Sequence, residues 1–347
     1  MNLHLFIPSL FWSDTTFPEI YQDLPLSSLE KLLSKSKATT HPASDYNAWL
    51  CQAFNIEKQL DWPIAPIMSQ TDRSNHDAAS KYDYWLRADP VHLRVEQNHI
   101  MLADSHAFEL TQEEAIQFTG VINQHLRNDD ITFLPFHPYR WYIRLTNTPE
   151  ILTHALNSAA CKNINTLLPT GKDSVKWHRI FNEIQMLLYD HPLNQVRIAR
   201  NQIAINSIWF WGGGHLPQST HSAYTHIWSD EPFSRSLANI SNTSSNLLPE
   251  NVENWLRDNR SEDQLVILNT LQTSDMYNLA FEWRENLKAL EKEWFSPLYT
   301  ALKNNQINTL RISTINENFS CDFVIKRNDL WKFWTTIKPL PFYAVSQ

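Results

Sequence analysis

The sequence predicts an α/β protein whose core is interrupted by an inserted α+β domain. Strand and helix patterns alternate in the first and last thirds of the 347-residue chain, while the middle third has a different order of elements. Hydrophobic residues make up 42% of the chain and charged residues 19%, which is typical of a globular protein. A chain of this length exceeds one ordinary core, so we expect one large domain or two interlocked ones.

The first third begins with a short apolar strand at about Leu3–Ile7. Leucines at helical spacing predict a helix over residues 26–35, and a second helix is expected over 45–58. The stretch 61–80 mixes prolines with polar residues, which predicts a loop or a crossing between domains.

The middle third combines strands and helices in an order that favours an α+β unit. Expected strands cover residues 84–95, 98–104 and 131–136, and expected helices cover 111–126, 173–190 and 191–201. We therefore assign residues 1–78 to the first part of the core, 79–202 to the inserted α+β domain, and 203–347 to the second part of the core.

The last third returns to an α/β rhythm. Its expected strands cover residues 203–211, 264–270, 308–314 and 322–327, a helix is expected over 277–293, and the aromatic segment 330–334 follows the last strand. The sequence contains no internal repeat and no low-complexity tract.

Charge and composition narrow the classes of partner. The formal net charge of −8 and the absence of a Lys/Arg run argue against nucleic-acid binding. No apolar run approaches the roughly 20 residues of a membrane span, and the short N-terminal apolar stretch has no positive region typical of a signal peptide. Cys51, Cys161 and Cys321 are too far apart for a disulfide framework or a zinc motif, which favours a reducing compartment. We expect a cytoplasmic protein with no nucleic-acid or membrane partner.

Glycine is rare in this chain, and its clustering is informative. Three of the five glycines, Gly212, Gly213 and Gly214, follow the aromatic strand "NSIWFW". At the end of a strand, glycine allows backbone N–H groups to approach an anion, but it serves equally in a tight turn. Both interpretations stay open, and the spacing matches neither a dinucleotide-binding motif nor a phosphate loop.

Charged residues concentrate in "WLRADPVHLR". Strand alternation places Arg87 and Asp89 on one face and His92 on the other. The arginine can bind a carboxylate or phosphate while Asp89 orients it, or the two can form an ordinary ion pair. Arg197 and Arg200, at helix-neighbour spacing, either join a shared anion pocket or lie on a solvated face.

Several segments together resemble one family. "LRADPVHL", "IMLAD" and "HPLNQVRIARNQIAINSIWFWGGGHLP" are similar to segments of the archaeal-type cofactor-independent phosphoglycerate mutases. "WLRADPVHL", "NEIQMLL" and "NSIWFWGGG" resemble the bacterial RpfE-type regulatory proteins more closely. The resemblance implies an alkaline-phosphatase-like core sheet with helices on both faces, an inserted substrate-side domain, and a glycine run where the chain returns to the core.

The catalytic motifs of active mutases in that family do not carry over. Those enzymes hold two divalent metal ions with Asp and His side chains and use a serine that becomes phosphorylated. Pro8 and Ser9 stand where the first Asp-Gly is expected, and "LDWPIAPIM" lacks the nucleophilic serine. Only Asp275 in "LQTSDMYN" could ligate a metal, and "INENFSCD" lacks the final histidine. Because two-metal catalysis needs both ions held and a nucleophile in line, we expect no metal-dependent phosphoryl transfer.

Three hypotheses about function follow. The first is a catalytically degenerate phosphoglycerate-mutase-like protein without a cofactor, which binds a small phosphorylated or carboxylated anion and has a regulatory protein partner. The second is an active mutase or phosphatase that holds Mn²⁺ or another divalent ion with rearranged ligands: Asp14, Asp89, Asp275 and His92. The third is a protein-interaction module, which exposed tryptophans favour. The residues predicted to bind the anion are Arg87, Asp89, His92, Arg197, Arg200, Asn206, Gly212, Gly213 and Gly214.

Overall fold

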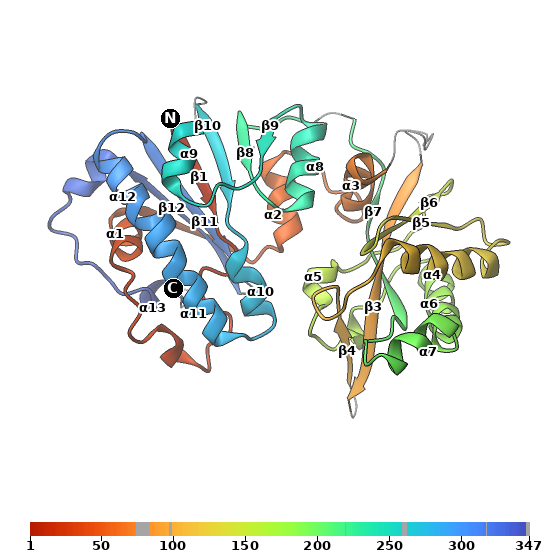
Figure 1. Ribbon diagram of the computed structural model, residues 1–347. Coiled ribbons are helices and arrows are strands. Elements are labelled where there is room, and N and C mark those ends of the chain that lie inside the picture. The colour runs from red at the N-terminus through yellow and green to blue at the C-terminus, as the bar shows by residue number, and fades with distance from the viewer. Residues whose placement is uncertain (74–82, 97–98, 219, 259–261, 317, 345–347) are drawn as a thin grey trace. The chain divides into compact units, whose positions relative to one another are not determined.

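A computed structural model describes residues 1–73, 83–96, 99–218, 220–258, 262–316 and 318–344 (Figure 1). The chain forms two compact units. Unit 1 comprises residues 1–55 and 221–347, and unit 2 comprises residues 56–220. Unit 1 is therefore built from both ends of the chain, with unit 2 between them in sequence. The boundary expected at 78/79 lies outside the described residues.

Unit 1 contains a mixed seven-stranded sheet in the order β2–β12–β11–β1–β10–β8–β9. The five strands from β11 to β9 are parallel, while β12 and β2 continue the sheet in antiparallel fashion. The strands are β1 (Asn2–Phe6), β2 (Lys37–Pro42), β8 (His226–Trp228), β9 (Ser244–Asn246), β10 (Asp263–Ile267), β11 (Thr309–Ile315) and β12 (Phe319–Lys326).

The helices of unit 1 lie on both faces of this sheet. They are α1 (Ser27–Lys35), α2 (Tyr46–Ala53), α8 (Pro232–Ile240), α9 (Val252–Asp258), α10 (Thr270–Met276), α11 (Ala280–Leu290), α12 (Ser296–Lys303) and α13 (Pro341–Ala344). A single π-helical turn, Glu291–Phe295, joins α11 to α12. Its Glu291 carboxylate accepts hydrogen bonds from the backbone N–H groups of Ser28 and Leu29, which satisfies the first turn of α1.

The two faces of the sheet differ in chemistry because side chains alternate along each strand. On one face, Leu3 and Leu5 of β1 belong to a hydrophobic core that includes leucines of α1, α11 and α12. On the other face, Phe6 stacks on Trp49 of α2 with ring centroids 3.6 Å apart. His4 shares that second face with Phe6, so this polar side chain lies under α2.

Unit 2 is built on an antiparallel sheet. Its strands follow the order β4–β3–β6–β5, and β7 pairs with β3 as well. The strands are β3 (Tyr84–Glu96), β4 (His99–Ala103), β5 (Thr132–His137), β6 (Arg140–Leu145) and β7 (Ser207–Gly214). The helices are α3 (Ile64–Asp72), α4 (Gln112–His125), α5 (Leu156–Ala159), α6 (Ser174–Tyr189) and α7 (Pro192–Ala199).

The structure confirms the α/β class, with a mixed central sheet and a second, antiparallel sheet. Two expectations need correction. Residues 64–72, in the stretch expected to be a loop or a crossing between domains, form helix α3. The prolines allow this helix because Pro63 precedes it and Pro66 lies in its first turn, where a missing N–H breaks no helical hydrogen bond. The glycine-rich strand β7 belongs to the sheet of unit 2 and pairs with β3, so it is not a strand of the core sheet. Across the described part of the chain, no helix is long and apolar enough to cross a membrane.

Candidate ligand-binding site

Arg87 and Asp89 form a buried ion pair inside unit 2. Their side chains are 4% and 1% exposed. The guanidinium donates from Nη2 to both carboxylate oxygens at 2.7 and 2.8 Å, and from Nε to Oδ1 at 3.0 Å. The indole N–H of Trp211 and the backbone N–H of Trp141 also donate to the Asp89 carboxylate. Both charged groups are therefore occupied by protein partners.

Aromatic rings enclose this pair. The guanidinium carbon of Arg87 lies 5.1 Å from the ring centroids of both Tyr142 and Trp211, which is cation–π distance. Burial has the largest influence on the Asp89 carboxyl and raises its pKa, while the bonds from Arg87 and Trp211 oppose that rise. Such an arrangement is typical of a core ion pair.

Arg197 is also occupied within the protein. It is 1% exposed and donates to the backbone oxygens of Ile203 and Glu109 and to the carboxylate of Glu114. Glu114 lies in the first turn of α4 and forms a capping box with Thr111, so Arg197 ties α7 to the start of α4. Arg200, three residues later, is exposed at the end of α7.

The other predicted polar residues connect β3 to the segment before β7. His92 Nδ1 lies 2.8 Å from the backbone oxygen of Ala204. The Asn206 side chain makes two hydrogen bonds to the backbone of Leu93, as a side chain that mimics a strand partner. These contacts hold β3 and β7 together.

The glycine run allows close packing of β7 against neighbouring elements. Gly212 has a φ of +66°, and a Cβ there would lie 2.9 Å from Ile64 Cβ. A Cβ on Gly213 would lie 2.2 Å from the Tyr84 hydroxyl oxygen, and one on Gly214 would lie 2.8 Å from Pro63 Cβ. The glycines thus bring strand β7 against α3 and β3. A ligand-binding role for the nine predicted residues stays a prediction.

Residues at the carboxyl ends of the core strands do not fit a two-metal centre. Ser9 follows β1 with a φ of 56° and donates its backbone N–H to Ile315. The Asp275 carboxylate accepts hydrogen bonds from the backbone N–H and the hydroxyl of Ser13. Asp14 accepts from Thr16. Among the described residues, no group of three or more His, Cys, Asp and Glu side chains is arranged to hold a metal ion.

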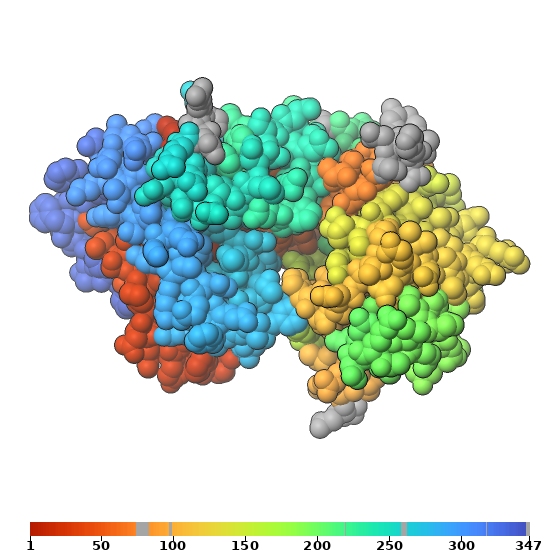
Figure 2. All heavy atoms as spheres, viewed as in Figure 1, coloured from red at the N-terminus to blue at the C-terminus, as the bar shows by residue number. Residues whose placement is uncertain are grey.

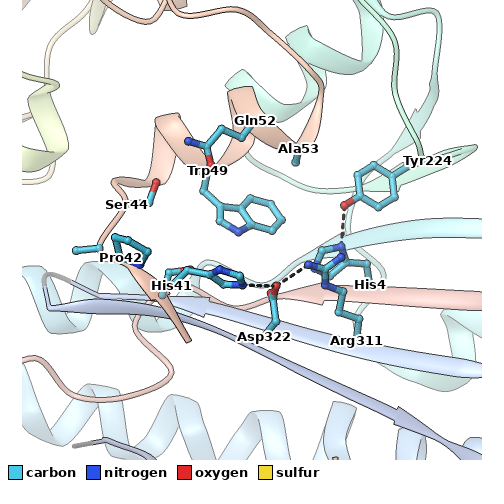
Figure 3. Close-up of a pocket in the computed structure, with 12 residues that line it drawn as sticks. His4, His41, Pro42, Ser44, Trp49, Gln52, Ala53, Tyr224, Arg311 and Asp322 are labelled. Atoms are coloured by element: carbon cyan, nitrogen blue, oxygen red, sulfur yellow. Dashed lines mark hydrogen bonds and ion pairs between the residues drawn. The ribbon is translucent and has the colours of Figure 1, made fainter. Parts of the chain in front are cut away.

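A polar pocket lies on the α2 side of the unit 1 sheet (Figure 3). Its volume is about 510 Å³, which is within the range of small-molecule sites. Strand register explains its floor: His4 pairs with Arg311, and Ser320 pairs with His41, so these side chains lie on one face together with Asp322. The lining residues are His4, His41, Pro42, Ala43, Ser44, Trp49, Gln52, Ala53, Tyr224, Arg311, Ser320 and Asp322.

Hydrogen bonds link the residues of this floor (Figure 3). Asp322 Oδ2 accepts from Arg311 Nη2 at 2.5 Å and from His41 Nε2 at 3.2 Å. Ser313 donates its hydroxyl proton to Asp322 Oδ1. The Ser313 oxygen must then accept from His4 Nε2 at 2.6 Å, so His4 Nδ1 accepts from the Tyr224 hydroxyl at 2.7 Å.

The charges of this floor follow from its surroundings. Burial lowers the pKa of His4 to about 3, and the charge of Arg311 adds to that effect, so His4 is neutral at physiological pH. Burial alone would raise the pKa of Asp322, but hydrogen bonds from Arg311 and Ser313 outweigh it and lower the pKa. Burial raises the pKa of Tyr224 to about 12. The floor therefore holds one permanent cation, Arg311, and one carboxylate, Asp322, which His41 also contacts.

Several hydrogen-bonding groups of the pocket have no partner among the residues that the structure describes. The Arg311 side chain is 47% exposed, and among the described residues only its Nη2 makes a hydrogen bond. Neither the indole N–H of Trp49 nor the amide of Gln52 pairs with any group in the described ranges. A ligand with acceptor oxygens can satisfy these donors without displacing a protein contact.

Sequence reasoning did not identify this pocket. The floor of the pocket is formed by single polar residues that stand within apolar strands. His4 lies between Leu3 and Leu5, and Arg311 lies between Leu310 and Ile312. The sequence signal for the pocket is this alternation in "NLHLF" and "TLRIST". In these two segments, a histidine or an arginine stands at a position that faces the same side of the sheet as the pocket. Strand order, which brings these residues together, comes only from the structure.

Comparisons with curated proteins give partial matches. The chain is 29% identical over 140 residues to the 2,3-bisphosphoglycerate-independent phosphoglycerate mutase of Methanosarcina mazei, a match covering 39% of this chain and 35% of that protein. It is 28% identical over 160 residues to the enzyme of the same name from Methanosarcina barkeri, covering 45% and 40%. The matches thus span less than half the length of these curated relatives. No family model matches the chain.

A solved structure shares the fold. The PH0037 protein from Pyrococcus horikoshii superimposes with a TM-score of 0.58 at 10% identity, covering 94% of this chain and 87% of that one. At this identity the similarity concerns the fold alone. The cofactor-independent phosphoglycerate mutase from Thermoplasma acidophilum gives a TM-score of 0.49 at 13% identity, covering 100% and 96%.

Proposed function

Since this chain is distantly related to the archaeal-type cofactor-independent phosphoglycerate mutases of the alkaline phosphatase superfamily, we propose that it is a catalytically degenerate relative of these enzymes. It acts by binding a small phosphorylated or carboxylated anion in the pocket of unit 1. Because its motifs also resemble those of the RpfE-type bacterial regulatory proteins, a regulatory role with a protein partner is part of this proposal.

The loss of phosphoryl transfer is supported by the residues after the core strands. Metal-dependent transfer needs two clamped cations and a nucleophile in line with the phosphoryl group. The positions after β1 carry Pro8 and Ser9, and Asp275 is bonded to Ser13. Among the other ligands of the rearranged-metal hypothesis, Asp89 is paired with Arg87, and His92 Nδ1 lies at hydrogen-bond distance from the backbone oxygen of Ala204.

The observation that carries the binding function is the half-exposed guanidinium of Arg311 on the pocket floor. It is held by Asp322 through one nitrogen, and its remaining N–H groups have no partner among the described residues, so they are free to bind a ligand. Arginine is suited to carboxylates and phosphates because its planar fork can donate two parallel hydrogen bonds. By contrast, Arg87 and Arg197 already have their acceptors inside the protein.

The catalytic part of the proposal is tested by turnover. We expect purified protein with added Mn²⁺ to interconvert 3- and 2-phosphoglycerate no faster than a protein-free blank, because the metal ligands and the nucleophile are missing. The M. mazei relative serves as the positive control. Metal-dependent turnover that disappears in Asp275→Asn, together with stoichiometric metal in the purified protein, would establish the rearranged-metal enzyme instead.

An exposed aromatic segment favours a second candidate function, a protein-interaction module. Trp331, Phe333 and Trp334 are 74%, 89% and 70% exposed. They lie in the C-terminal part of unit 1, which is blue in Figure 2. Residues 326–338 carry four basic side chains against one acidic one in a chain of net charge −8. Charge complementarity therefore indicates an acidic segment of a partner protein as the occupant.

This second candidate is tested with an acidic amphipathic probe peptide of alternating Glu and Leu. We expect its affinity to fall at least about tenfold in the double variant Trp331→Ser, Trp334→Ser, and also to fall in high salt. The matched control is Phe281→Ser, which removes a ring that is 76% exposed elsewhere on unit 1. If the unchanged protein, the double variant and Phe281→Ser bind the peptide with equal affinity, the exposed aromatic segment is not the interaction surface.

A further inference from the structure

The charges of the unit 1 pocket restrict the anion that it can take. Arg311 is permanently charged, Asp322 is ionised, and His4 is neutral, so the one permanent cation of the floor is shared between Asp322 and any ligand. His41 donates its Nε2–H to Asp322, because an ionised carboxylate only accepts. A phosphate monoester would place two negative charges beside Asp322 and opposite one arginine, and like charges at close range are unfavourable. A ligand with one charge avoids this cost.

The aromatic wall of the pocket is held rigidly. Trp49 stacks on Phe6 at an interplanar angle of 7°, and the His4 ring meets Trp49 edge-on at 5.5 Å. Tyr224 is fixed by its hydrogen bond to His4. Rings that are already ordered lose little conformational entropy when a ligand binds, and they favour a flat partner.

The ring and the charge of a ligand can be satisfied together. The wall formed by Trp49 and Tyr224 lies above the floor formed by Arg311 and Asp322 (Figure 3). The Tyr224 hydroxyl donates its hydrogen bond to His4 Nδ1, so its oxygen can only accept from a ligand, while Trp49 and Gln52 supply donors. These features suit a ligand that has a flat ring, a singly charged anionic group with two oxygens, and a polar substituent.

We propose that the pocket of unit 1 binds a planar ring compound that carries a single carboxylate. The carboxylate pairs with the free N–H groups of Arg311, and the ring lies against Trp49. This inference rests on the proposed function, since it names the ligand class of the same site. It distinguishes the pocket from a phosphoglycerate site, whose ligand carries a phosphate monoester and no ring.

Four small probes test the inference, with calorimetric titration of the full-length protein. Benzoate has both ring and single carboxylate, acetate lacks the ring, benzamide lacks the charge, and phenyl phosphate replaces the carboxylate with a phosphate monoester. We expect benzoate to bind with a dissociation constant on the order of 1 mM and each other probe at least about tenfold more weakly. Inorganic phosphate is titrated in parallel.

Variants locate the binding. Arg311→Lys keeps the charge but loses the fork, and Trp49→Leu removes the ring; each should weaken benzoate binding at least about fivefold. Arg94→Met, which removes a side chain that is 73% exposed on unit 2, should leave it unchanged. Circular dichroism and the melting temperature show that each variant is folded.

The outcomes separate the two proposals. Phenyl phosphate binding as tightly as benzoate, with loss in Arg311→Lys, would overturn the carboxylate inference and leave the proposed anion site standing. Benzamide binding as tightly as benzoate would also overturn the inference, because the charge would then be irrelevant. Binding of benzoate that neither Arg311→Lys nor Trp49→Leu weakens would place the ligand elsewhere. If no probe and no phosphate binds, both the inference and the proposed anion site are wrong.

Discussion

Replacing Arg87 with Met should destabilise the protein by about 3–5 kcal/mol, because it leaves the Asp89 carboxylate buried without its cation. Asp89 is 1% exposed and would keep only the N–H groups of Trp211 and Trp141. Methionine occupies a similar volume, so the loss reflects charge and hydrogen bonding more than a cavity. Denaturant unfolding followed by circular dichroism measures the change.

A double variant separates the ion pair from a binding role. Arg87→Met with Asp89→Leu removes both charges, and we expect it to recover a large part of the lost stability, since a buried pair can be replaced by apolar residues at little cost. Arg200→Met is the matched control, because that arginine is exposed and should change stability by less than about 0.5 kcal/mol. A stable single variant Arg87→Met would contradict the structural role that the geometry gives this arginine.

The elements that the sequence predicts well are those whose patterns are local. The apolar patterns of β1, β10 and β11 and the helical spacing of the leucines in α1 depend only on neighbouring residues, and the structure confirms all four elements. For such elements, propensity and packing agree.

One expected strand was assigned to the wrong part of the chain because its pairing depends on a distant partner. Strand β7 has the pattern of a buried strand, but its pairing with β3 joins residues more than a hundred positions apart, such as Asp89 with Trp209. No local signal assigns it to unit 2 instead of the core sheet. Helix α3 was missed for a local reason. Its prolines are typical of a loop, but Pro66 lies in the first turn, where proline is compatible with a helix.

The candidate site illustrates the same limit. Arg87, Asp89 and His92 are conspicuous in the sequence because they cluster, and Asn206 because it lies near the glycine run, yet the structure pairs each of them within the protein. In contrast, the pocket of unit 1 is assembled from residues as distant as His4 and Asp322. Each of these side chains is unremarkable in its own segment, and only the strand order brings them together.

The central claim is that the pocket around Arg311, and not the buried arginines of unit 2, binds the anion. Chemical modification of arginine by phenylglyoxal, mapped by peptide mass spectrometry, tests it most directly. Arg311 is 47% exposed, whereas Arg87 and Arg197 are 4% and 1% exposed. The two buried side chains should react at least about 100-fold more slowly than Arg311, because their reaction requires local unfolding.

Benzoate at saturating concentration should then protect Arg311 from phenylglyoxal. The exposed Arg200 should stay as reactive as before and serves as the internal reference. This result would place the anion on the floor of the unit 1 pocket. Rapid modification of Arg87 or Arg197 in the folded protein, with protection of those residues and none of Arg311, would contradict the account and return the site to unit 2.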